Sequence, residues 1–171
     1  MAQVKKFKVG EKAVYPAHGV GEIVDLQVRS IGGKEQQFYI LNVLENGMKI
    51  MVPVETAQTT GLRHVMSRDK AREVMDILKA DEVAVTSQPW NRRNREYTDM
   101  LKSGDPFEVA RVFRDIYRLK SEKELSFGER RLLDLAHSLL VLELSLALNK
   151  TEADIDKDID SIFQSKQTPA A

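Results

Sequence analysis

The chain contains no cysteine and carries no formal net charge, because 26 lysine and arginine residues balance 26 aspartate and glutamate residues. Without cysteine there are no disulfide bonds and no thiolate chemistry, which fits a reducing compartment. The charges are also spread evenly along the chain. Residues 1–64 hold 8 basic and 6 acidic residues, residues 65–150 hold 16 and 15, and residues 151–171 hold 2 and 5. No region is a polybasic arm, so contact with a polyanion requires a local patch.

Long hydrophobic runs are missing as well. Residues 1–8 lack the apolar core of a signal peptide. The most apolar stretch, Leu132 to Leu148, is interrupted by Asp134, His137 and Glu143. A membrane span needs about 20 predominantly apolar residues. We therefore expect a cytoplasmic protein without a membrane partner.

Sequence motifs of enzymatic chemistry are not found. There is no phosphate-binding glycine loop, no G-x-S-x-G motif and no histidine pair at the helical spacing of a metal site. His18, His64 and His137 each stand alone in the sequence, whereas a catalytic base needs partners within hydrogen-bond reach. We predict a protein that is not an enzyme, with no catalytic residues, no metal site, no cofactor and no small-molecule substrate.

Short β-type runs separated by turn residues fill the first third of the chain. The expected strands cover residues 12–16, 20–29, 37–44 and 48–52. Gly32 and Gly33 lie in the expected turn between the second and third strands. Asn46-Gly47 predicts a type I′ turn before the fourth, because both of its central residues need a positive φ. Strands at this spacing indicate a small, strongly bent antiparallel sheet of the Tudor or SH3-like kind.

Two apolar residues of this sheet are candidate contacts with a partner. Met51 lies on the opposite face from Ile50 and Val52 by strand alternation, and Ile31 lies at a hairpin tip. Local packing of both side chains is the alternative interpretation. The unpaired edges of a small sheet are also natural docking surfaces for a partner's strand.

From Ser67 onward the apolar residues recur with a helical period. The expected helices cover residues 67–78, 91–102, 105–119, 126–148 and 151–163. Ser67 and Asp105 are expected caps, and Ser126 with Glu129 forms a capping box. The prediction is an α+β protein with an N-terminal β domain (1–64), an all-α bundle of about five helices (67–165) and a disordered tail (166–171).

The stretch Pro89 to Arg95 stands out within this helical part. It contains the only tryptophan, Trp90, followed by Arg92, Arg93 and Arg95. A flat apolar ring can unstack bases, and arginines can neutralise phosphates. Core packing of the tryptophan is the alternative, since most tryptophans are largely buried. The scarcity of apolar residues and of a run of acids around Trp90 favours a wedge that contacts nucleic acid.

The chain resembles the CarD/CdnL family of bacterial RNA polymerase-binding transcription factors over nearly its whole length. The similarity includes residues 9–21, with the sequence VGEKAVYPAHGVG, and residues 44–53, with the sequence LENGMKIMVP. In the helical part it includes Trp90 to Arg93, Ser103 to Asp105 and Leu125 to Arg131. Transcription-repair coupling factors carry a module similar to the first region. The order of several separated motifs makes the resemblance to CarD and CdnL specific.

This resemblance implies a Tudor-like domain that docks on the β subunit of RNA polymerase and a helical domain that contacts promoter DNA at the upstream edge of the transcription bubble. The implied DNA-binding residues are Trp90, Arg92, Arg93, Arg95 and Arg130. The implied polymerase-binding residues are Arg29, Ile31, Met51 and Pro53. Met51 stands where some members have an arginine, which points to the CdnL-like branch. Some longer relatives append a basic tail with an AT-hook, and we expect no such tail in this chain.

The expected function is stabilisation of the open promoter complex by a protein associated with the nucleoid through the polymerase. The alternative is an adaptor that bridges RNA polymerase to another protein without touching DNA. The adaptor function predicts that Arg92→Ala and Arg93→Ala leave promoter complexes unaffected, whereas DNA contact predicts that they change them.

Overall fold

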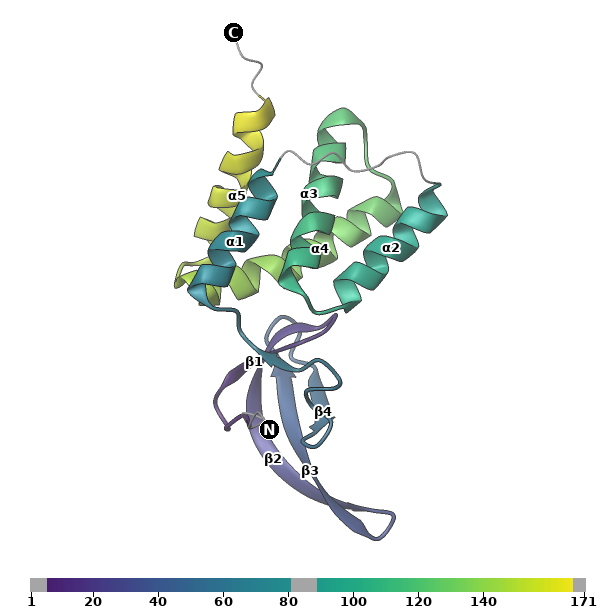
Figure 1. The fold of residues 1–171 in the computed structure, drawn as a ribbon, viewed down its shortest axis with the longest axis vertical. Helices are drawn as coiled ribbons and strands as arrows, with labels where there is room; N and C mark the ends of the chain where they lie inside the picture. The colour runs from purple at the N-terminus through teal and green to yellow at the C-terminus, as the bar shows by residue number, and fades with distance from the viewer. Residues whose placement is uncertain (1–5, 81–88, 168–171) are drawn as a thin grey trace. The chain divides into compact units, whose positions relative to one another are not determined.

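The protein is described by a computed structural model that covers residues 6–80 and 89–167, with side chains to residue 164 (Figure 1). The chain divides into two compact units, Met1–Val65 and Met66–Ala171. The first unit is an antiparallel sheet and the second is helical, which confirms the predicted α+β class.

A five-stranded sheet in the order β4-β3-β2-β1-β5 forms the first unit. Its strands are β1 (Lys12–Tyr15), β2 (Gly19–Ile31), β3 (Lys34–Val43), β4 (Lys49–Pro53) and β5 (Arg63–His64). The four predicted strands are confirmed. The fifth was not predicted, because two residues are too few to show an alternating pattern. It pairs with β1 through Ala13 opposite His64.

One face of this sheet is covered by the apolar core of the unit. The core includes Ile23, Tyr39, Leu41 and Val52, which are at most 3% exposed. Along β3, alternation places Tyr39 and Leu41 of this core at odd-numbered positions, and the even-numbered Phe38 and Ile40 on the other face are also buried. A register shift between Ile23 and Asp25 lets β2 continue as a long hairpin with β3.

The predicted turn type at Asn46-Gly47 is wrong. Gly47 has a φ of 72°, but Asn46 is not among the non-glycine residues with a positive φ. The hairpin instead closes through a longer loop, in which the Gly47 amide donates to the Val43 carbonyl and the Asn46 side chain accepts from the Met48 amide. Gly32 and Gly33, with φ of 59° and 81°, occupy the tight turn between β2 and β3, where glycine bears no steric cost.

Five helices make up the described part of the second unit. They are α1 (Arg68–Lys79), α2 (Trp90–Lys102), α3 (Pro106–Glu122), α4 (Phe127–Leu148) and α5 (Glu152–Gln167). The side chains of Ser67 and Asp105 accept backbone hydrogen bonds as predicted, and Ser126 with Glu129 forms the complete capping box. The helix α5 extends into the expected tail, whose residues 168–171 lie outside the described part of the chain.

The long helix α4 packs against α1, α2, α3 and α5. Its buried residues include Leu132, Leu140 and Leu144, which belong to the core of the helical unit. Glu143 is 3% exposed and its carboxylate accepts a hydrogen bond of 2.8 Å from the Met66 amide. That contact fixes the first residue of the helical unit to its central helix.

No single helix in the described ranges is both long enough and apolar enough to cross a membrane. The helices α4 and α5 reach that length and composition only as a pair, with a bend of 111° between them.

Candidate nucleic-acid interface

Trp90 is the first residue of α2 and lies against the start of α4. The ring is partly buried and packs on the apolar core of the helical unit. It approaches the α4 backbone at Gly128, where an added Cβ would stand 3.1 Å from Cζ2 of the indole. A contact this short leaves no room for a larger side chain without movement of the ring. Glycine at position 128 therefore provides the seat for Trp90.

Arg93, one turn further along α2, holds the ring from the same helix. Its guanidinium carbon lies 5.5 Å from the centre of the Trp90 ring, within the range of a cation–π interaction. The Arg93 side chain is 15% exposed, and its Nη2 lies 3.6 Å from Oε2 of Glu129. Arg93 thus links the tryptophan to a carboxylate on α4.

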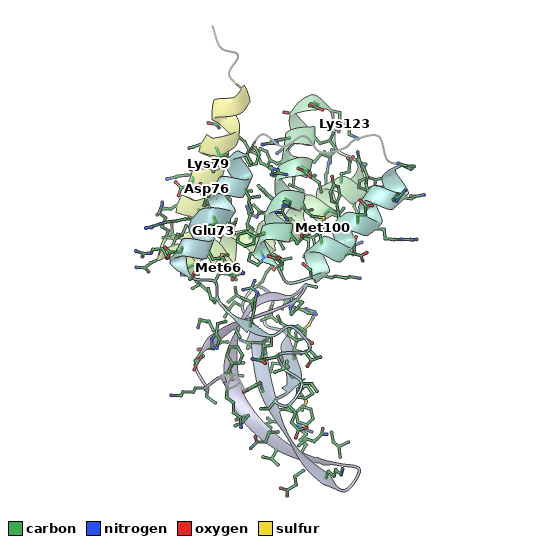
Figure 2. All side chains as sticks on the ribbon, viewed as in Figure 1. Met66, Glu73, Asp76, Lys79, Met100 and Lys123 are labelled. Atoms are coloured by element: carbon green, nitrogen blue, oxygen red, sulfur yellow. The ribbon has the colours of Figure 1, made fainter. Side chains whose placement is uncertain are left out.

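Glu129 is a buried carboxylate, 1% exposed as a residue. Its Oε1 accepts hydrogen bonds from the Ser126 amide at 3.0 Å and from Lys123 at 3.1 Å. Figure 2 labels Lys123 at the turn between α3 and α4. Burial raises the pKa of Glu129, but the hydrogen bonds from Ser126 and Lys123 and the charge of Lys123 lower it below the ordinary value. The residue is therefore a carboxylate at neutral pH.

These contacts join the first turn of α2 to the first turn of α4. Trp90 rests on Gly128, Arg93 rests on Trp90, and Glu129 binds Arg93 from the position next to Gly128. The sequence predicted Glu129 only as the closing residue of a capping box. Its second role was missed, because nothing local connects it to Arg93.

The other predicted DNA-binding arginines point outward. The Arg92 side chain is 70% exposed and that of Arg130 is 57% exposed, and Arg95 is exposed as well. Arg92 lies 3.7 Å from Glu96, and Arg130 lies 3.0 Å from Glu124. Exposed pairs of this kind contribute about 0–1 kcal/mol. They can therefore open at little cost when a phosphate is offered.

An exposed phenylalanine adds a feature that the sequence analysis did not identify. Phe127 is 82% exposed, the most exposed large hydrophobic residue of the described chain. It is the first residue of α4 and directly precedes Gly128. A single exposed apolar side chain is common on protein surfaces, so it is the position of Phe127, next in sequence to Gly128, that makes it a candidate contact. The sequence feature that could have identified Phe127 is its place as an apolar residue between the cap Ser126 and Gly128.

All four predicted polymerase-binding residues lie on one face of the sheet. In the strand register, Ile31 faces Lys34, Arg29 faces Gln36, Pro53 faces Phe38 and Met51 faces Ile40. These partners are the even-numbered positions of β3, on the face opposite to Tyr39 and Leu41, where Phe38 and Ile40 are buried and Lys34 and Gln36 are exposed. Ile31 is 53% exposed and Met51 is 43% exposed. The face therefore combines exposed apolar groups with the exposed Arg29.

Two of the histidines that stand alone in the sequence have carboxylate neighbours in the structure. Nδ1 of His64 lies 3.7 Å from Glu11, and Nε2 of His137 lies 2.6 Å from Asp156. Within the described residues, no group of three or more histidine, aspartate or glutamate side chains could hold a metal ion.

Comparison with known proteins assigns both units to characterised domain families. Residues 7–66 match the CarD-like/TRCF RID domain, and residues 73–160 match the C-terminal domain of CarD. An RID domain followed by a CarD C-terminal domain defines a class of transcription factors. The chain belongs to the CarD/CdnL family.

Two relatives illustrate the extent of the likeness. YdeB of Bacillus subtilis (strain 168), a protein named for a role as a transcription factor, is 32% identical over 149 residues, covering 87% of this chain and 97% of YdeB. The solved structure of CdnLNt from Myxococcus xanthus is 43% identical and covers 39% of this chain and 94% of that chain, with a TM-score of 0.32.

Proposed function

We propose that this protein docks on the β subunit of RNA polymerase through its sheet unit and stabilises the open promoter complex through its helical unit. The helical unit contacts DNA at the upstream edge of the bubble, with Trp90 as a wedge and Arg92, Arg95 and Arg130 on the phosphates. The observation that carries the proposal is the seat of Trp90 on Gly128. It holds a partly buried aromatic ring at the start of a helix, next to cations.

A wedge has to be rigid before it meets the DNA. Unstacking a base step costs a few kcal/mol, and less where the duplex is already open. Trp90 contacts Gly128, and the guanidinium of Arg93 lies over its ring. Little ordering of the side chain is then required on binding. Among the arginines, Arg93 therefore positions the ring, while the three exposed ones meet phosphates.

The charge of this surface suits a protein that is delivered to DNA by a partner. Contact of about three arginines with phosphates gives a salt slope of roughly −3, which means weak binding alone. Docking on the polymerase supplies an effective concentration on the order of millimolar. The sheet face with Arg29, Ile31, Met51 and Pro53 is the proposed dock. In this proposal the protein is cytoplasmic, and its binding to the polymerase associates it with the nucleoid.

Stabilisation of the open complex requires a difference in affinity between open and closed DNA. Trp90 provides this difference if it binds the melted edge better than intact duplex. Loss of about 1–2 kcal/mol in Trp90→Ala would shorten the open-complex lifetime by roughly one order of magnitude.

The experiment is the half-life of open complexes on a ribosomal-type promoter after heparin challenge, with purified polymerase. The expected result is a longer half-life with the wild-type protein and loss of that effect with Trp90→Ala. An equal half-life with both proteins would exclude Trp90 as a wedge and would mean that its role is packing.

The adaptor function is supported by a different observation. Arg92 and Arg130 both have acidic partners, Glu96 and Glu124, within the helical unit. A surface of paired charges also suits a protein partner. An adaptor predicts that Arg92→Ala leaves open-complex half-lives unchanged, whereas DNA contact predicts a shorter half-life and a smaller salt slope.

A further inference from the structure

A second surface with several cations lies along α1 and at Lys150, between α4 and α5, away from the tryptophan on α2. A groove with a volume of about 560 Å³ runs between these helices and the end of α4. Four residues of α1 line one side at helical spacing: Arg68, Arg72, Met75 and Lys79. Leu148 and Lys150 line it at the end of α4, and Asp158, Ser161 and Ile162 line the α5 side. Figure 2 marks the length of α1 by Met66 just before it and Lys79 at its end.

The lining of the groove combines a strong positive charge with an apolar floor. Its cations are Arg68, Arg72, Lys79 and Lys150, against the single acid Asp158. Arg72 lies 3.9 Å from Asp69, but both side chains are exposed, at 67% and 91%. The pair of Lys150 with Asp158, at 2.9 Å, is also half-exposed. These two pairs hold Arg72 and Lys150 only weakly.

The apolar floor decides between two kinds of anionic partner. Duplex DNA would satisfy the cations, but its backbone offers no apolar contact to the exposed parts of Met75 and Leu148, which are only partly buried against the core that contains Ile162. A helix with acidic residues flanking an apolar stripe satisfies both parts of the groove, in the way amphipathic helices bind in grooves. The unbranched side chain of Met75 adapts to the shape of such a partner.

We propose that the groove between α1 and α5 binds an acidic amphipathic helix of a protein partner. Arg68 and Lys79 are eleven positions apart along the helix (79 − 68), or about 16 Å. The partner segment is therefore about three turns long. This site is independent of the DNA contact proposed for Trp90, and the protein could bind both partners in one complex.

The test uses the full-length protein with 13C-labelled methionine methyl groups and a synthetic peptide of about 16 residues, long enough to form a helix. The peptide carries leucine at positions i, i+3, i+4 and i+7 and glutamate elsewhere. Met75 reports on the groove, and Met100 on α2, outside it, is the control. A peptide of the same composition in shuffled order tests the pattern. A duplex DNA of similar length tests the other kind of partner.

We expect the patterned peptide to shift the Met75 methyl signal and leave the Met100 signal unchanged. Arg72→Glu should weaken peptide binding about tenfold, because it places a like charge beside the acidic partner. Lys157→Glu, which changes an exposed cation on α5 outside the groove, should leave the affinity within about twofold.

Five results would overturn the proposal. One is no shift of Met75 up to about 1 mM peptide, a weak-binding limit. Equal binding of the shuffled peptide, or equal loss in both charge variants, would indicate unspecific attraction. Tighter binding of DNA than of peptide would make the groove a nucleic-acid site. A shift of Met75 with protein concentration alone would make it a contact between copies of this chain.

Discussion

Replacement of Glu129 by glutamine removes the negative charge that connects Arg93 and Lys123 while keeping the shape of the side chain. The glutamine carbonyl can still accept from the Ser126 amide, now 3.0 Å from Oε1. What is lost is the attraction to Lys123 at 3.1 Å and to Arg93 at 3.6 Å. We expect a less stable helical unit and a looser seat for Trp90.

The size of the effect follows from the exposure of the three partners. Removing one member of a fully buried ion pair costs about 3–5 kcal/mol. The Glu129 side chain is 2% exposed, but that of Lys123 is 51% exposed and can turn to water. Arg93 remains 15% exposed. The expected loss is about 2 kcal/mol, within the range of hydrogen bonds to charged groups.

The pH dependence of this loss has a defined sign. The pKa of Glu129 is lower in the folded chain than its ordinary value of 4.5. Its contribution to stability is therefore complete above pH 4.5 and is lost as the pH falls through the folded pKa. The difference between the wild type and Glu129→Gln should be constant near neutral pH and should shrink under acidic conditions.

Urea unfolding followed by far-UV circular dichroism, repeated over a pH series, measures both effects. The matched control is Glu124→Gln, whose side chain is 88% exposed although it also pairs with an arginine. That control should change stability by less than about 1 kcal/mol. Equal losses in the two variants, or a difference that grows as the pH falls, would refute this account of Glu129.

Three further predictions concern the surfaces around this site and the sheet. In a Trp90→Ala background, Gly128→Ala should add about 0.5–1 kcal/mol of stability through helix propensity. In the wild type it should add little or nothing, because the new Cβ meets the indole ring. A double-mutant cycle in urea measures the difference. Phe127→Ala should leave stability within about 0.5 kcal/mol and shorten open-complex half-life after heparin challenge; an unchanged half-life would exclude the ring from the interface. Met51→Asp should abolish co-elution with RNA polymerase on gel filtration, whereas Met48→Asp, at a similarly exposed loop methionine, should not.

The parts of the fold that local chemistry determines were predictable. Ser126 and Glu129 predict the start of α4, because the side chain of each accepts a hydrogen bond from the backbone amide of the other. Asp105 before Pro106 starts α3 for a similar reason. The end of α3 was less clear: it runs to Glu122 rather than Leu119, since no proline or glycine stops it there.

The arrangement around Trp90 could not be predicted from local patterns. The ion pair of Arg93 and Glu129 joins residues 36 positions apart (129 − 93) on two helices. Gly128 looks like an ordinary helix glycine until the indole ring is placed against it. The sequence indicated the importance of Trp90 and its arginines, but only packing separates Arg93, which is mostly buried, from the exposed Arg92.

The lone indole also gives the molecule an optical property. All tryptophan fluorescence of this chain comes from Trp90, whose ring lies against Gly128 and beneath the guanidinium of Arg93. Selective excitation of tryptophan therefore reports on one site in the helical unit. The sheet unit has only tyrosine and phenylalanine as fluorophores and does not contribute to this emission. Undocking of α2, or arrival of a base on the ring, would change the emission of the unlabelled protein. A stopped-flow instrument could then time the contact of the ring with DNA in a mixture of the isolated protein and DNA.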